Sequence, residues 1–143
     1  MREKLYNIIK GAELMTGAVA EINSFEYSFD DMNTNIILSD ICTDYMNEVG
    51  LENISRDTTF KASIDMGNVS YVVPSIHPFF DITNGIDIPL HRKEFAKATI
   101  SDYAKDQMIK MALSLALTGY KIISNQEIYK EIVDEFKKTT QQI

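Results

Sequence analysis

The sequence predicts an α/β protein, because amphipathic helical stretches alternate with short runs of β-branched and aromatic residues. The predicted order is helix, strand, helix, connection, strand, strand and two helices, with turn-forming residues between them. The first three elements form a small α+β unit, and the rest is typical of the end of an α/β domain. The polar connection that follows Gly50 predicts a boundary between residues 1–50 and 51–143. Neither part contains a full sheet, so the predicted fold is incomplete.

The first part contains two helices and one strand. Residues 2–15 place apolar side chains on one stripe at helical spacing. Residues 18–27 are rich in Val, Ile, Phe and Tyr and predict a strand. In the polar turn that follows, Asn33 or Thr34 can cap a helix that ends at Gly50.

The second part begins with strand signals and ends with helices. Residues 59–64 alternate and predict a short strand, and residues 69–76 form a strand-like apolar run. Ser101 predicts the cap of a long helix, and Ser124 with Glu127 matches a capping box for the last helix. The predicted buried face of the long helix comprises Met108, Ile109, Met111, Ala112, Leu115, Ala116, Tyr120 and Ile123.

Composition limits the partners and the compartment. The chain has 143 residues, with 14 basic and 21 acidic side chains and a net charge of −7. An acidic surface argues against nucleic acid and anionic membrane as partners. No apolar run approaches the ~20 residues of a membrane helix, and the N-terminus lacks the apolar core of a secretion signal. Cys42 has no cysteine partner and lies at helical spacing beside Leu38 and Met46, which predicts packing in a reducing, cytoplasmic protein.

His91 is the first candidate site residue. It follows Pro89 and Leu90, so a stiffened segment presents its imidazole. A neutral imidazole suits zinc or a similar divalent metal, but zinc requires three or four ligands and no cluster with ligand spacing accompanies His91. The alternative is that His91 caps the helix predicted to begin near Lys93.

Further candidates flank the apolar run. His77 lies at its end, as a structural residue or as a donor to a substrate carboxylate or carbonyl. Asp65 precedes Gly67 and Asn68 in a turn, which Asp65 could hold through the backbone. The alternative is a polar wall of a binding site, with Gly67 allowing close approach of the backbone.

The run from Ser63 to Pro74, with its Asp-Met-Gly-Asn-Val-Ser core, resembles a signature of metal-dependent amidohydrolases of the aminoacylase/carboxypeptidase superfamily, near the aminobenzoyl-glutamate hydrolases. Pro89-Leu90-His91 with Glu94-Phe95 resembles the segment that supplies the last metal-ligand histidine of that family. Residues 112–123 are similar to its closing helix, and residues 11–35 to the second half of its lid domain.

The resemblance implies a fold, a site and a substrate class. Residues 1–50 would be the second half of a lid that also mediates dimerisation, and residues 51–143 the C-terminal part of the catalytic domain. His91 would bind zinc or manganese. Asp65, Gly67 and Asn68 would line the substrate pocket, with His77 as a further candidate. The expected substrate is an N-acyl or aminobenzoyl amino acid or a dipeptide, cleaved at its amide bond.

The other metal ligands of that family, and its general-base Glu, have no counterpart in this sequence. We therefore expect the chain alone to be inactive, with no catalytic residue of its own, and to associate either with itself or with the missing N-terminal half. The alternative is a non-catalytic folding and association module.

Overall fold

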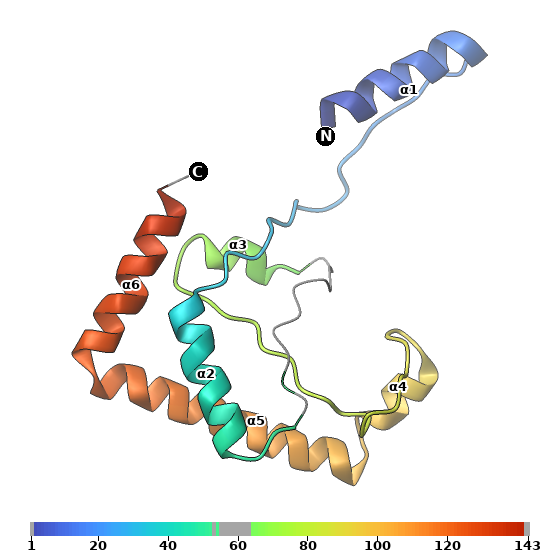
Figure 1. The fold of residues 1–143 in the computed structure, drawn as a ribbon. Helices are drawn as coiled ribbons and strands as arrows, with labels where there is room; N and C mark the ends of the chain where they lie inside the picture. The colour runs from blue at the N-terminus through green and yellow to red at the C-terminus, as the bar shows by residue number, and fades with distance from the viewer. Residues whose placement is uncertain (1, 53, 55–63, 142–143) are drawn as a thin grey trace.

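A computed structural model describes residues 2–52, 54 and 64–141. Within these ranges the chain forms six helices, which Figure 1 shows in sequence order. Their bounds are α1 Arg2–Thr16, α2 Ile36–Glu48, α3 Met66–Ser70, α4 Lys93–Ala98, α5 Asp102–Ser124 and α6 Gln126–Thr140. The predicted helices at both ends of the chain are therefore confirmed.

The expected α/β class is wrong for this structure. Its described ranges contain no strand, and the only β-type pairing among them is an isolated parallel bridge between Thr34 and Ser75, with the Asn35 amide donating to the Ser75 carbonyl at 3.0 Å. Residues 18–27 have no strand partner, and the run 69–76 begins in α3 and continues as turn and extended chain. A strand requires a neighbour to accept its backbone hydrogen bonds, and sequence propensity alone does not supply one. Most of the strand predicted for residues 59–64 lies outside the described residues.

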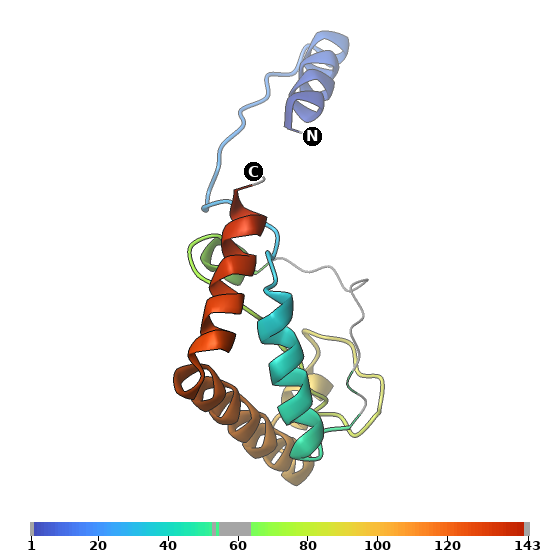
Figure 2. The same cartoon turned by 60° about the vertical axis from the view of Figure 1, so that its left-hand side comes forward.

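Helices α2, α5 and α6 pack together and hold the main core (Figures 1 and 2). Cys42 and Met46 of α2 meet Met111 of α5, and Leu51 closes the cluster after α2 ends. Burial raises the pKa of the Cys42 thiol, although a hydrogen bond with Thr118 lowers it in part. The packing role predicted for Cys42 agrees with its 1% exposure.

The buried face of α5 differs from the predicted one. Among the eight residues predicted for that face only Met111 is buried; Ile109 is 63% exposed and Tyr120 70%. The face that lies inward instead carries Ala104, Gln107, Met111, Ser114 and Thr118. The hydroxyls of Ser114 and Thr118 donate to carbonyls one turn back in the same helix, so both are buried with a hydrogen-bond partner.

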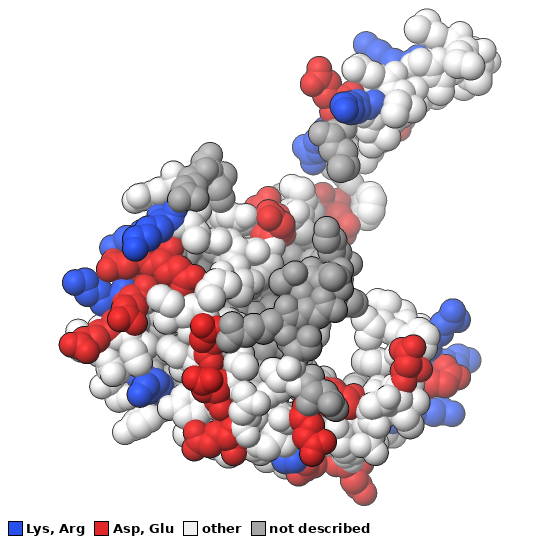
Figure 3. Space-filling view, viewed as in Figure 1, with Lys and Arg blue, Asp and Glu red and all other residues white. Residues whose placement is uncertain are grey.

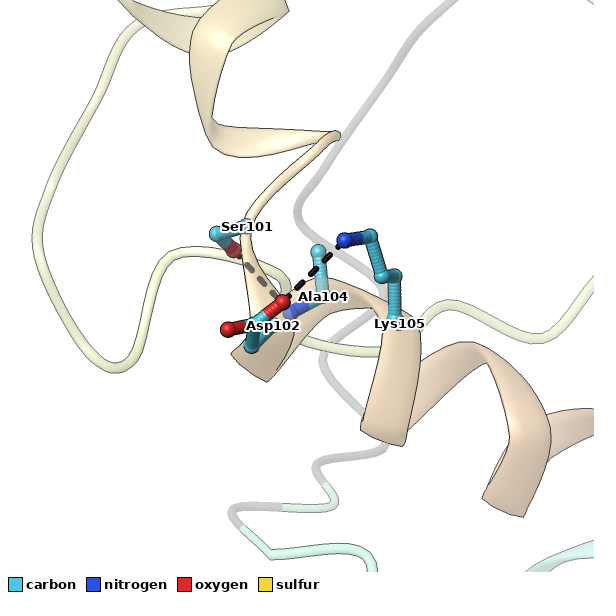
Figure 4. Close-up of polar contacts among 4 residues, drawn as sticks. All are labelled: Ser101, Asp102, Ala104 and Lys105. Carbon is cyan, nitrogen blue, oxygen red and sulfur yellow. Dashed lines mark hydrogen bonds and ion pairs between the residues drawn. The ribbon is translucent and has the colours of Figure 1, made fainter.

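Helix starts follow local capping chemistry. The Ser101 hydroxyl accepts from the Ala104 amide at 3.1 Å, which confirms the predicted cap of α5 (Figure 4). Asn35, rather than Asn33 or Thr34, caps α2 by accepting from the Leu38 amide at 3.0 Å. Asn125, rather than Ser124, caps α6.

The N-terminal part of the chain stands away from the other helices. We call residues 2–29 the arm and the remaining described residues the body. In Figures 1 and 2, α1 is separated from the body and joined to it by an extended segment. No residue of α1 is buried, and Phe25 and Tyr27 of the extended segment are 92% and 94% exposed.

Candidate functional site

The turn around α3 brings three of the predicted site residues together. Asp65 precedes the helix and makes no side-chain capping bond, whereas Gly67 and Asn68 lie within it. Gly67 is buried directly beneath the Asp30 carbonyl, and a Cβ at this position would overlap that oxygen. The backbone that comes close to Gly67 belongs to this chain, and the place predicted for Gly67 in the wall of a binding site stays a prediction.

Asn68 bonds to Ser28 and Asp30, where the arm joins the body, with both ends of its amide. Its Oδ1 accepts from the Asp30 amide at 3.3 Å, and its Nδ2 donates to the Ser28 carbonyl at 3.3 Å and to Asp30 Oδ2 at 3.2 Å. These three bonds engage both polar atoms of the Asn68 side chain.

His91 is exposed and has an unusual backbone conformation. Its φ is 62°, in the left-handed region that residues other than glycine seldom adopt. Left-handed conformations of such residues cluster at functional sites. The cap position of α4 belongs to Arg92, and no hydrogen bond joins the His91 ring to another described residue, so we find no support for the alternative of a helix cap.

His77 lies on the extended segment after Ser75 and is also exposed. Its ring meets Phe79 edge-on, with centroids 4.6 Å apart. This contact is the kind that a surface histidine makes with an aromatic neighbour.

The predicted site residues do not converge on one point in the described part of the chain. Both ribbon views separate α3 from α4, which follows His91 (Figures 1 and 2). Within the described ranges, no group of three or more His, Cys, Asp or Glu side chains could hold a metal ion. His91 is thus available as one ligand, and the described residues alone do not fit a complete metal site.

Asp81 is a site feature that we did not predict. Its carboxylate accepts from the amide and hydroxyl of Thr83, from the Gly85 amide at 2.8 Å and from the Tyr103 hydroxyl at 3.2 Å. Burial raises the pKa of Asp81, but these hydrogen bonds outweigh it and the pKa lies below its ordinary value. The pattern Asp-x-Thr-x-Gly, typical of a side-chain-held turn, was the available sequence signal.

Asp81 also lines a cavity of about 200 Å³ with Leu51, Phe79 and Phe80. The bond from Tyr103 fastens this turn to α5. The segment that leads to His91 is therefore attached to α5 at Asp81, ten residues before the histidine.

On the face seen in Figure 3, acidic side chains lie over much of the described part of the body, and the basic side chains near α1, α4 and α6 have acidic ones among them. Near the root of the arm, the Tyr71 hydroxyl donates to Asp31 at 3.0 Å. This hydrogen bond raises the pKa of Tyr71.

No helix in the described ranges is long and apolar enough to cross a membrane.

Comparison with known proteins found two similar enzymes, and no family model matches the chain. The chain is 31% identical over 140 residues to a protein from Mus musculus named Xaa-Arg dipeptidase, and 30% identical over 145 residues to the Homo sapiens protein of that name. These matches cover 96% and 99% of this chain but 32% and 33% of the two enzymes. The chain thus spans about a third of the length of its curated relatives, and nearly all of it is related in sequence to peptidases.

Proposed function

We propose that this chain is the C-terminal part of a metal-dependent peptidase or amidohydrolase. The observation that carries the proposal is sequence similarity to two dipeptidases along nearly the whole chain. The substrate would be a dipeptide, including one with a C-terminal arginine as the names of the relatives indicate, or an N-acyl or aminobenzoyl amino acid.

His91 would be a metal ligand in the intact enzyme, with zinc or manganese as the ion. Its exposed ring and left-handed backbone support this role. A divalent ion in such a site would act as a Lewis acid. The part this chain plays is to present one imidazole from a segment that Asp81 holds to α5.

Asp65, Gly67, Asn68 and His77 would line the substrate pocket. The bonds of Asn68 to Ser28 and Asp30 mean that a direct contact between Asn68 and substrate requires the arm to move. We therefore rank Asp65 and His77 above Gly67 and Asn68 as residues that meet the substrate.

The chain alone would be inactive, because His91 is a single ligand and no described cluster completes a site. The remaining ligands would come from another polypeptide, which makes self-association or pairing with an N-terminal half part of the proposal. The localisation proposed for the chain is cytoplasmic. The competing proposal is a non-catalytic association module, favoured by the large exposed apolar area of the arm.

A chimera tests the catalytic proposal. This chain would replace the matched third of the mouse Xaa-Arg dipeptidase, and hydrolysis of a dipeptide with C-terminal arginine would be measured with added zinc or manganese. We expect metal-dependent activity that falls at least ~100-fold in a His91→Ala variant, because loss of a ligand should cost more than the roughly 10–100-fold loss seen for outer-shell partners.

Lys93→Ala is the matched control, since Lys93 is an exposed residue near His91 with no proposed role. A folded chimera whose activity survives His91→Ala would refute the ligand role. Hydrolysis by the purified chain alone would refute its proposed inactivity. A folded chimera without activity would favour the association module.

A further inference from the structure

Helix α5 carries a second row of apolar side chains, which the body leaves exposed. Seven of the eight residues predicted for the buried face of α5, all except Met111, are exposed. They follow helical spacing from Met108 to Ile123, so they form one stripe along the helix. We call these seven residues the outer stripe. Figures 1 and 2 show α5 along one edge of the body, which a partner can reach.

The outer stripe is apolar and carries no charge. Every exposed residue from Met108 to Ile123 is Met, Ile, Leu, Ala or Tyr. Ile109 is 63% exposed, Tyr120 70% and Ile123 85%. Both lysines of this segment are less exposed and lie outside the stripe. A contiguous apolar surface of this kind marks a place where a protein meets a partner.

Helix α6 shows the opposite pattern. Its exposed residues include Glu127, Lys130, Glu131 and Lys138, which is the composition of a helix face in water. Helices α5 and α6 contact each other and α2, so both belong to the same packed unit. The exposed apolar stripe is therefore a property of α5 and not of every helix in the body.

We propose that the outer stripe docks against the remaining polypeptide of the intact peptidase, on an apolar surface of that polypeptide. The two relatives each contain additional polypeptide, because this chain matches only 32% and 33% of their length. A helix that is apolar beyond its own packed face is typical of the core of a larger protein. The covering surface must be apolar too, because the stripe has no charge to pair and a buried unpaired charge is costly. This inference rests on the proposed function and names the surface at which the two parts of the enzyme meet.

The arm of this chain does not cover the stripe. The stripe is exposed with the arm present, and α1 stands apart from the body in both ribbon views (Figures 1 and 2). A second copy of this chain is the competing occupant, and the experiment below separates it from the remaining polypeptide of the peptidase.

Thiol labelling of the isolated chain, and of the chimera with the mouse enzyme, tests the inference. Ile109→Cys places a thiol on the outer stripe, and Lys130→Cys places the control thiol on the charged face of α6. In the isolated chain both thiols should react with a maleimide at similar rates. In the chimera Ile109→Cys should react at least ~10-fold more slowly, because a thiol inside a packed interface reacts only when that interface opens. Lys130→Cys should react as before.

Mass spectrometry of peptides assigns the label to each cysteine. Cys42 is 1% exposed and should stay unlabelled in both proteins, and cysteines of the mouse part are read separately. If the chimera folds with Ile109 but not with Ile109→Cys, Ala112→Cys takes its place, because it is a smaller change on the same stripe.

Three results would overturn the inference. One is labelling of the stripe in the folded chimera as fast as in the isolated chain. Another is a chimera that does not fold even with Ile109 unchanged, because the mouse polypeptide then offers the stripe no cover. The third is protection of Ile109→Cys in the isolated chain that rises with chain concentration, which would assign the stripe to a second copy.

The labelling result is independent of hydrolysis, so the two proposals can fail separately. A folded chimera that protects the stripe but is inactive would support the docking surface and count against the catalytic proposal. An active chimera that leaves the stripe freely labelled would do the reverse.

Discussion

The arm and the body both contain amphipathic helices, yet only the helices of the body bury apolar side chains. In the body, Met46 and Met111 are 4% and 5% exposed, whereas Leu14 and Met15 of the arm are 89% and 88% exposed. The accessible surface of the chain is 11355 Å², against about 7,500 Å² expected for a compact protein of its mass. Helical periodicity therefore forms a helix in both regions, but burial depends on a neighbour that the arm does not find in this chain.

The largest expected difference between body and arm is the loss of unfolding free energy when one methionine in each is replaced by alanine. We expect Met111→Ala to lower the free energy of unfolding by about 2–5 kcal/mol, because it leaves a cavity between α5 and α2. Met15→Ala on α1 should change it by less than about 0.5 kcal/mol. Urea denaturation followed by circular dichroism measures both. Equal losses would mean that the arm is packed in solution.

A smaller effect is expected where α6 caps α2. The two carboxylate oxygens of Glu135 accept from the Ile36 and Ile37 amides at 2.8 and 2.9 Å. These amides have no partner within α2, and the carboxylate also opposes the positive end of the helix dipole. Glu135→Gln should therefore cost about 1–2 kcal/mol. Glu131→Gln, an exposed change on the same helix, serves as the control and should cost little; a similar loss in both would disprove the cap.

Asp81 should make the stability of the body depend on pH. Its pKa is lower in the folded state, so its contribution is complete above the unfolded value of about 3.9 and is lost as the pH falls through the folded value. Asp81→Asn should cost about 1 kcal/mol at pH 6, from weakened hydrogen bonds to Thr83 and Gly85. Denaturation midpoints measured between pH 6 and pH 3 should differ less between the unchanged chain and Asp81→Asn as the pH falls. If the difference between these midpoints does not change with pH, the charge of Asp81 is not its cause.

The smallest effect is expected for the ion pair at the start of α5. Lys105 Nζ lies 3.1 Å from Asp102 Oδ1, and both side chains are mostly exposed (Figure 4). Such pairs contribute less than about 1 kcal/mol. Lys105→Ala should thus change the thermal midpoint no more than Lys4→Ala does in the arm, and a clearly larger drop would show that the pair is better held than its exposure indicates.

Part of the candidate site was predictable, and part was not. The sequence predicted that Gly67 lets the backbone approach closely in the wall of a binding site, and in the structure the backbone of Asp30 lies against it. It could not identify the approaching segment, because Asp30 is 37 residues away and carries no pattern that points to α3. The roles of His91 and His77 in a metal or substrate site, and the division at residue 50, stay predictions.

The sequence by itself determined where the long helices run and how α5 begins, because periodicity and the Ser101 cap act over a few neighbouring residues. Only the tertiary structure decided which face of α5 is buried, because that choice depends on α2, which presents Cys42 and Met46 to a stripe containing Gln107, Ser114 and Thr118. It also decided that residues 18–27 and 69–76 form no strands. A strand is completed by a partner elsewhere, and the described chain offers these runs a single bridge at Ser75.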